Sequence, residues 1–220
     1  MSGSIVSPET RAKFRGAAVP IAMAMGRLGL TPSALTVIGF LISIVAAIAA
    51  AGQAWLAAGL LVIGGAAFDV FDGALARAQG KAGRLGGYVD SVFDRASEGI
   101  VFVGIIAGLV EAGWAGAPVW AAAALAASQL VPYTRAKAES LGFTKGTGMA
   151  DVGLAPREVR IVILTLGLIG AGLLGTDGFG ATPAGVVALE GSLGLIAILA
   201  TLTAIQRTIH VMRQATKEKK

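Results

Sequence analysis

The sequence has no cysteine, a single histidine and few charged side chains, which make up 14% of its 220 residues. The absence of cysteine excludes disulfide frameworks, thiolate nucleophiles and zinc ribbons. Apolar residues make up 55% of the chain and the mean hydropathy is +0.76, far above the value of a water-soluble domain. So much apolar surface also excludes intrinsic disorder. The composition therefore predicts a membrane protein.

Long stretches without charge divide the chain into membrane spans. No charged residue occurs in the 41 residues from Leu28 to Phe68, and Gly52–Gln53 breaks this stretch near its middle. A hydrocarbon core about 30 Å thick needs about 20 helical residues, so the stretch holds two spans. The sequence predicts six spans in all: Ser33–Ala51, Ala54–Ala76, Leu85–Val110, Gly116–Ala138, Ile161–Gly175 and Gly185–Ile205.

The expected fold is an all-α integral membrane domain of six transmembrane helices over residues 31–212. An amphipathic juxtamembrane helix precedes it in an N-terminal arm (1–30), and a basic tail (213–220) follows it. The arm mixes basic and apolar residues from Pro8 to Arg27, so we expect it to lie on anionic lipid, interrupted at Pro20. Thr31–Pro32 is typical of an N-cap followed by proline at the first helical position.

The positions of the basic residues predict the topology. All 18 Lys and Arg lie in the arm, in residues 77–95, in residues 135–160 or from residue 207 onward, and the alternate connections hold none. By the positive-inside rule both termini are cytoplasmic, which requires an even number of spans. We therefore expect a multi-pass protein of the plasma membrane. Basic residues at one membrane face favour anionic lipid or a phosphorylated substrate, and no nucleic-acid partner is expected.

Four aspartates lie at the two helix ends that flank the second basic segment. Asp69 and Asp72 are three residues apart and Asp90 and Asp94 four, so each pair shares one helical face. Both pairs are predicted at one depth beneath the cytoplasmic surface. An aspartate in mid-membrane costs about 2.5 to 3.5 kcal/mol, so these side chains need compensating charge. Oxygen ligands alone favour Mg²⁺ or Mn²⁺ over zinc, and two such ions would bind and polarise a diphosphate.

Other interpretations of this cluster are an electrostatically paired helix end, a buried ion site without chemistry, an ion transporter whose aspartates bind cargo, and a membrane prenyltransferase. The sequence has no evident inverted repeat, and its charge gathers at one face rather than at the midplane, which argues against transport. A prenyltransferase would normally have more than six spans and a different aspartate spacing.

The residues from Asp69 to Asp94 spell D-x2-D-G-x2-A-R-x8-G-x3-D-x3-D. This run resembles the signature of the CDP-alcohol phosphotransferases, integral membrane enzymes of phospholipid synthesis. The resemblance implies transfer of a phosphatidyl-type group from a CDP-linked lipid, CDP-diacylglycerol or CDP-archaeol, to an alcohol, with release of CMP. It implies that Asp69, Asp72 and Asp90 hold one Mg²⁺ or Mn²⁺ ion, and Asp69, Asp90 and Asp94 a second. Asp94 would also accept the proton of the attacking hydroxyl.

The same resemblance implies a homodimer and a site for the CDP headgroup. The headgroup would lie at the start of the first span and at the aspartate motif, where free helix N-terminal amides suit an anion. The residues concerned are Thr31, Pro32, Ser33, Ala34, Gly73, Arg77 and, through its amide, Gly83.

Basic residues at the cytoplasmic ends of the last three spans bear on the acceptor: Arg135, Lys137, Arg157, Arg160 and Arg207. Each on its own can be read as snorkelling to lipid headgroups. Together they favour a phosphorylated acceptor, because a free alcohol such as serine needs no converging cations. Arg157 and Arg160, three residues apart, could fork onto one phosphate. These segments resemble the inositol-phosphate-using branch of the family, so inositol phosphate is the expected acceptor and glycerol 3-phosphate the alternative.

Overall fold

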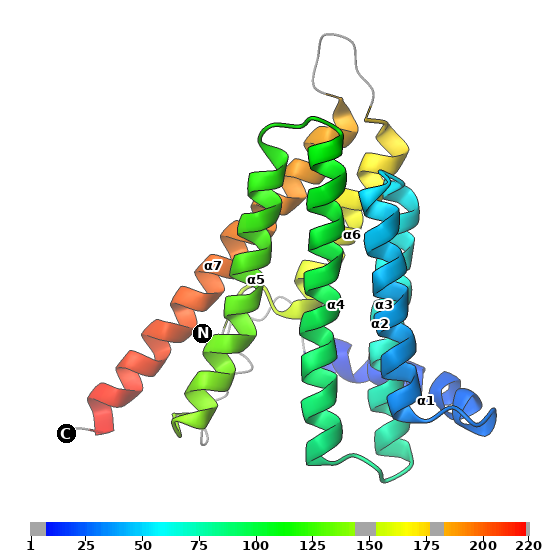
Figure 1. Cartoon of the computed structure of the whole chain (residues 1–220). Helices are drawn as coiled ribbons and strands as arrows, with labels where there is room; N and C mark the ends of the chain where they lie inside the picture. Colours follow the sequence, from blue (N-terminus) through cyan, green and yellow to red (C-terminus); the bar gives the residue numbers. More distant parts are fainter. Residues whose placement is uncertain (1–7, 144–152, 177–182, 219–220) are drawn as a thin grey trace.

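The computed structural model describes residues 8–143, 153–176 and 183–218, and these form seven α-helices (Figure 1). Six of them, α2 to α7, pack side by side as a bundle, and α1 lies across its lower end in the view of Figure 1. The helices are α1 (Pro8–Arg27), α2 (Pro32–Ala51), α3 (Trp55–Ala78), α4 (Arg84–Glu111), α5 (Ala117–Ser140), α6 (Arg157–Leu174) and α7 (Ala184–Glu218).

The boundaries of α2 follow directly from the sequence. Thr31 is its N-cap, with its Oγ1 accepting a hydrogen bond of 3.2 Å from the amide of Ala34, and Pro32 is the first helical residue. Both features confirm the prediction made from Thr31–Pro32. The chain then turns at Gly52–Gln53, where Gln53 has a φ of 60°, and α3 begins at Trp55. The uncharged stretch is therefore two helices, as predicted.

Each predicted span corresponds to one helix, although the ends differ. The last helix continues to Glu218, past the predicted end at Ile205 and through the predicted tail. Within the described part of the chain, three segments are long and apolar enough to cross a membrane by length and composition: Pro32–Ala51, Trp55–Ala78 and Ala184–Thr216. The other bundle helices are less apolar, since α4 and α6 carry several charged residues and α5 contains two prolines and polar residues such as Ser128 and Gln129.

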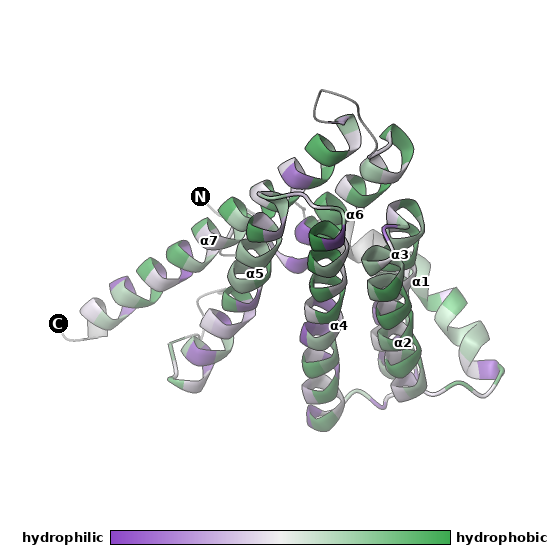
Figure 2. Cartoon of the chain, turned by 45° about the horizontal axis from the view of Figure 1, so that its top comes forward, coloured by the Kyte–Doolittle hydropathy of each residue, from purple (hydrophilic) through white to green (hydrophobic). Residues whose placement is uncertain are grey.

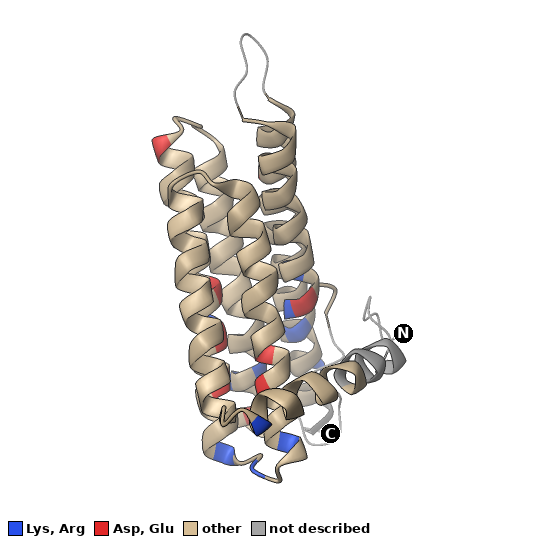
Figure 3. Cartoon of the chain, turned by 90° about the vertical axis from the view of Figure 1, so that its right-hand side faces the viewer, with Lys and Arg blue, Asp and Glu red and all other residues tan. Residues whose placement is uncertain are grey.

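The outside of the bundle is apolar. Figure 2 shows hydrophobic residues along most of its helices, and large apolar side chains such as Leu41, Ile48, Leu60 and Leu166 are exposed. Apolar surface of this extent is what a lipid environment accepts and water does not. Charged residues gather instead in the lower half of the bundle (Figure 3). The chain is a membrane protein whose charged side chains lie mostly toward one end of the bundle.

The N-terminal helix packs on the bundle rather than standing apart from it. Ala18 and Ala22 of α1 are buried in a cluster with Leu35, Ala74 and Leu75 of α2 and α3. The helix runs through Pro20 without ending, so the predicted interruption at this residue is wrong. The contacts that α1 makes with α3 stabilise the helix on both sides of the proline.

The short helix α6 begins well inside the bundle, at a higher level than the lower ends of α3 and α4 in Figure 1. The segment before it is not helical, and its amides need acceptors. Thr203 of α7 supplies one, because its Oγ1 accepts hydrogen bonds from the amides of Leu154 (3.1 Å) and Ala155 (3.0 Å). Ala155 is completely buried there.

Close contact between α2 and α4 depends on glycine. A Cβ built on Gly104 would lie 2.2 Å from the carbonyl oxygen of Ala47, and one on Gly108 would lie 2.1 Å from that of Ala50. Small residues of this kind let membrane helices approach closely. Because the obstacle is the backbone of the neighbouring helix, a larger residue can be accommodated only if the two helices separate.

We therefore expect Gly104→Ala to lower the free energy of unfolding by about 1 to 3 kcal/mol, the usual cost of overpacking. Gly191→Ala is the matched control, since a Cβ on this α7 residue meets no atom within 4 Å and alanine is the better helix former. Thermal unfolding of the purified protein in detergent measures both. Equal melting temperatures for the two variants would show that the α2–α4 contact is looser than described.

Candidate active site

Two of the four predicted aspartates converge on one cation. Asp69 of α3 and Asp94 of α4 both pair with Arg157, the first residue of α6. The distances are 2.5 Å from Arg157 Nη2 to Asp69 Oδ2 and 2.7 Å from Arg157 Nη1 to Asp94 Oδ1. All three side chains are between 14% and 22% exposed. Three helices therefore meet at this point, and the guanidinium offsets two of the carboxylates.

Asp72 is held from the other side, by α2. It is 4% exposed, and its Oδ2 accepts a hydrogen bond of 2.6 Å from Thr36 Oγ1. This bond places the first turns of α2 beside the aspartate motif. Sequence reasoning did not single out Thr36, because nothing in the local pattern shows that its hydroxyl faces an aspartate on another helix.

The fourth aspartate, Asp90, completes the group. It is half-buried and within electrostatic range of Asp69, Asp72 and Arg157. The four carboxylates thus face one region, but no three acidic or histidine side chains in the described residues lie close enough together to hold a metal ion as they stand. Like charges repel one another, and here Arg157 separates Asp69 from Asp94. The donor set is made of carboxylate oxygens and already holds a cation, so it fits a hard divalent ion.

Gly39 makes room for Asp69. A Cβ on this α2 residue would lie 3.1 Å from Asp69 Oδ1 and 3.3 Å from the carbonyl oxygen of Gly65 on α3. The missing side chain therefore lets α2 pass close to α3 at the level of the carboxylate. The sequence contains 32 glycines, and nothing local distinguishes this one.

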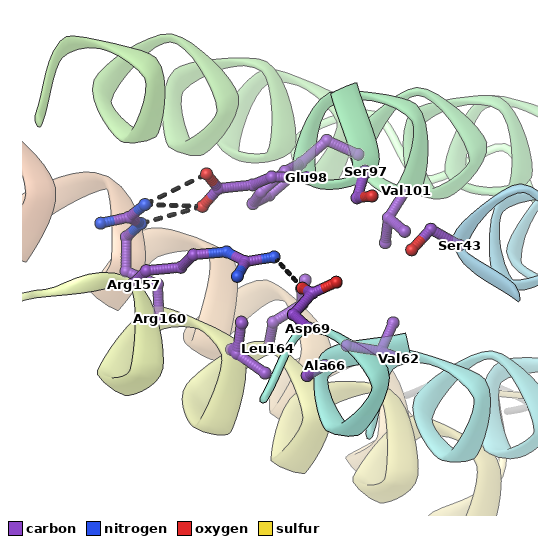
Figure 4. A pocket seen from close by; sticks show the side chains of 12 residues that line it. Ser43, Val62, Ala66, Asp69, Ser97, Glu98, Val101, Arg157, Arg160 and Leu164 are labelled. Carbon is purple, nitrogen blue, oxygen red and sulfur yellow. Dashed lines mark hydrogen bonds and ion pairs between the residues drawn. The ribbon is translucent and has the colours of Figure 1, made fainter. Parts of the chain in front are cut away.

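Arg160 forms its ion pair with a different residue from those that Arg157 binds. It is 2% exposed and forks onto Glu98 of α4, with distances of 2.8 Å and 3.0 Å to Glu98 Oε1 and 3.1 Å to Oε2 (Figure 4). Its Nη1 also donates to the carbonyl oxygen of Ala155 at 2.9 Å. The joint fork of Arg157 and Arg160 onto one phosphate stays a prediction, and in this arrangement Arg160 instead ties α6 to α4.

Glu98 is the main residue that sequence reasoning missed. Besides Arg160 it also binds Arg95, whose Nη1 lies 2.7 Å from Glu98 Oε2. A signal was available, because Asp90, Asp94 and Glu98 recur every fourth residue and so share one face of α4.

The residues predicted for the nucleotide lie at helix ends on the same side of the bundle. Thr31, Pro32, Ser33 and Ala34 form the cap and first turn of α2. Arg77 lies over Gly73, since a Cβ on that glycine would lie 3.2 Å from Arg77 Nη1. Gly83 is the exposed N-cap of α4, in an extended conformation with a φ of −149°.

The residues predicted for the acceptor divide into surface and buried groups. Arg135 is half-exposed and pairs with Glu139 at 2.8 Å, and Lys137 is exposed in the last turn of α5. Arg207 of α7 is 5% exposed, donates to the carbonyl oxygen of Val131 and is within electrostatic range of Arg135 and Arg160. Arg207 thus links cations of α5, α6 and α7 into one group.

A small cavity of about 40 Å³ lies beside the ion pairs, between α2, α3, α4 and α6 (Figure 4). Asp69, Glu98, Arg157 and Arg160 line it together with the hydroxyl-bearing Ser43 and Ser97 and apolar side chains. This volume holds a water molecule or two, not a substrate.

A family profile described as CDP-alcohol phosphatidyltransferase matches residues 29–216 of the chain. The chain is 34% identical to an archaetidylinositol phosphate synthase of Pyrococcus horikoshii over 88% of its own length and 90% of that protein. It is also 34% identical to a phosphatidylinositol phosphate synthase of Mycobacteroides abscessus, over 97% of its own length and 89% of that protein.

Solved structures resemble the chain as well. The crystal structure of Mycobacterium tuberculosis phosphatidylinositol phosphate synthase in complex with manganese and citrate has a TM-score of 0.74 and 28% identity, covering 89% of this chain and 88% of that one. The same synthase with CDP-DAG bound has a TM-score of 0.73 and 31% identity, covering 88% of this chain and 92% of that one.

Proposed function

Because the chain belongs to the CDP-alcohol phosphatidyltransferase family, we propose that it transfers a phosphatidyl-type group from a CDP-linked lipid to inositol phosphate and releases CMP. The observation that carries the proposal is the meeting of Asp69 and Asp94 on one cation, together with a second group of cations formed by Arg135, Arg160 and Arg207. The carboxylates suit a diphosphate held through metal ions, and the group of cations suits the phosphate of the acceptor.

The proposed metal sites use the four aspartates. Asp69, Asp72 and Asp90 would hold one Mg²⁺ or Mn²⁺ ion, and Asp69, Asp90 and Asp94 the other. A manganese complex of the Mycobacterium tuberculosis synthase supports this choice of metal. When bound, the ions supply Lewis acidity that polarises the diphosphate and offsets the charge that develops on the departing CMP.

The remaining steps belong to side chains of the protein. The nucleotide would lie at Thr31, Pro32, Ser33 and Ala34, where the N-terminus of α2 favours an anion, and Gly83 would offer its amide from the start of α4. Gly73 has no side chain, which leaves room for the Arg77 guanidinium that would bind the headgroup there.

Asp94 accepts the proton of the attacking hydroxyl at its carboxylate. The hydroxyl oxygen then bonds to the lipid-linked phosphorus, and the bond from that phosphorus to the oxygen of CMP breaks. Arg135, Lys137 and Arg207 would hold the acceptor phosphate that brings the hydroxyl to this position.

The proposed setting is the plasma membrane, with α2 to α7 as six spans and with both termini and the active site on the cytoplasmic side. Basic residues on one side of the bundle support this orientation. The helix α1 would lie at the headgroup level, and residues 31–212 would form the catalytic domain. Small residues on the helix surfaces are compatible with a homodimer.

The acceptor is tested by offering purified protein CDP-diacylglycerol or CDP-archaeol with inositol phosphate, glycerol 3-phosphate, serine or inositol, and measuring CMP. We expect release with inositol phosphate. Preference for glycerol 3-phosphate would show that the enzyme uses another acceptor of the family. Preference for an unphosphorylated alcohol would contradict the proposal that the cations bind the acceptor phosphate.

The variant Arg207→Ala is expected to raise the KM for inositol phosphate at least tenfold and the KM for CDP-lipid much less. A charge-assisted hydrogen bond contributes about 1.5 to 3 kcal/mol, and we assign this one to the acceptor alone. Arg213→Ala, an exposed arginine further along α7, is the control. Equal increases in both KM values would contradict the assignment.

A further inference from the structure

Arg157 occupies the oxygens that the proposed function assigns to metal ions. Its two terminal nitrogens bind Asp69 Oδ2 and Asp94 Oδ1, one from α3 and one from α4. A divalent ion bound by both carboxylates would need the same space and the same lone pairs. Two cations also repel each other at such distances, so the guanidinium and the ion exclude one another.

The backbone of Arg157 is held in place by its neighbours, whereas its side chain is incompletely hydrogen-bonded. One turn later, Arg160 anchors α6 to Glu98 and to the carbonyl oxygen of Ala155. These bonds do not involve the Arg157 side chain. Its Nε is buried and, within the described residues, has no hydrogen-bond partner. A donor left without a partner makes this position less favourable than the two ion pairs alone suggest.

The acceptor phosphate would be an alternative binding partner for the Arg157 guanidinium. The acceptor phosphate proposed above would lie among cations of α5, α6 and α7, and Arg157 lies one turn before Arg160, which is within electrostatic range of Arg207. The side chain is long and 22% exposed, so it can turn about its fixed backbone. A phosphate dianion would offer it a bidentate partner in place of the carboxylates.

We propose that Arg157 is the internal counter-cation of the metal-free site: a divalent ion displaces its guanidinium from Asp69 and Asp94, and the released guanidinium binds the acceptor phosphate. This inference rests on the proposed function for its second half. Metal binding and acceptor binding are then coupled, and because coupling is reciprocal, the acceptor also raises the affinity for the metal. The acceptor site is therefore complete only when the metal is bound.

The exchange is tested without turnover by titrating the full-length protein in detergent with Mn²⁺ and following free Mn²⁺ by electron paramagnetic resonance. Arg157→Gln removes the competing cation, so we expect its Kd for Mn²⁺ to fall about tenfold, which corresponds to about 1.4 kcal/mol. Arg213→Gln removes one positive charge at an exposed position and is expected to leave the Kd unchanged. An unchanged or higher Kd in folded Arg157→Gln overturns the exchange.

Arg157→Lys gives a second measurement should the glutamine variant fail to fold. An ammonium cannot fork onto two carboxylates as a guanidinium does, so Mn²⁺ should bind more tightly than to the unaltered protein but by a smaller factor. An unchanged Kd in this variant also counts against the exchange.

The coupling is tested by calorimetric titration with inositol phosphate, with and without Mn²⁺ and with no CDP-lipid. We expect Mn²⁺ to tighten binding at least tenfold in the unaltered protein and to have little effect in Arg157→Gln. Equal Mn²⁺ effects in both proteins overturn the coupling. No inositol phosphate binding under either condition contradicts the proposed acceptor instead, and the Mn²⁺ titration then decides the exchange on its own.

Discussion

Asp90→Asn is expected to reduce CMP release by on the order of a thousandfold. The substitution keeps the shape of the side chain and removes one carboxylate that the proposal assigns to both metal ions. Losing the Lewis acidity of well-held ions costs several kcal/mol of transition-state stabilisation, and each 1.36 kcal/mol is tenfold in rate. The assay is CMP formation from CDP-lipid and inositol phosphate at saturating Mg²⁺.

The same variant should fold at least as well as the unaltered protein. Asp90 is repelled by Asp69 and Asp72, so a neutral amide relieves like-charge repulsion in the metal-free site. We expect an unchanged or higher melting temperature beside the lost activity. Glu111→Gln, an exposed residue at the far end of α4, is the control for charge. Full CMP release by well-folded Asp90→Asn would contradict the proposed metal sites.

Glu98→Gln is expected to lower the free energy of unfolding by about 3 to 5 kcal/mol, the cost of leaving a buried charge without its partner. The charge is that of Arg160, which is 2% exposed and forks onto this carboxylate. Arg95 loses its 2.7 Å contact with this carboxylate as well and keeps only Asp94, at 3.7 Å, as an ion-pair partner in the described residues. Thermal or denaturant unfolding in detergent measures the loss.

Two further variants separate a buried pair from a surface pair. Glu139→Gln breaks an ion pair with Arg135 whose members are 46% and 48% exposed, and such a pair contributes about 0 to 1 kcal/mol. The double variant Glu98→Leu with Arg160→Met replaces both buried charges by apolar side chains, and we expect it to recover much of the loss. Equal losses in Glu98→Gln and Glu139→Gln would mean that Arg160 finds another partner.

Local pattern was sufficient to predict the helices, and the aspartate motif was sufficient to predict the family. Uncharged length predicted α2 and α3, and Thr31 and Pro32 predicted the start of α2. The spacing of the carboxylates predicted that each pair shares a face. The resemblance built on this motif predicted the family to which the chain belongs, and membership in it sets aside the ion-transporter alternative.

Sequence spacing did not predict interactions between residues that are distant in the chain. Arg157 and Arg160 are one turn apart, yet one binds α3 and α4 aspartates while the other binds Glu98. Spacing shows which side chains are neighbours and not which partner each will meet. Pro20 was misread for a similar reason, because propensity favours a break and packing of α1 on α3 outweighs it.

Because α6 starts late, water and lipid can both reach the region of the aspartates. Irregular backbone at membrane depth is tolerated only if its polar groups are satisfied, and the Thr203 hydroxyl does this for Leu154 and Ala155. With a full-length helix here, the cationic side chain that opens α6 would emerge near the headgroups instead of opposite the aspartates. A sugar phosphate dissolved in water and a lipid anchored in oil can therefore react without either leaving its own phase.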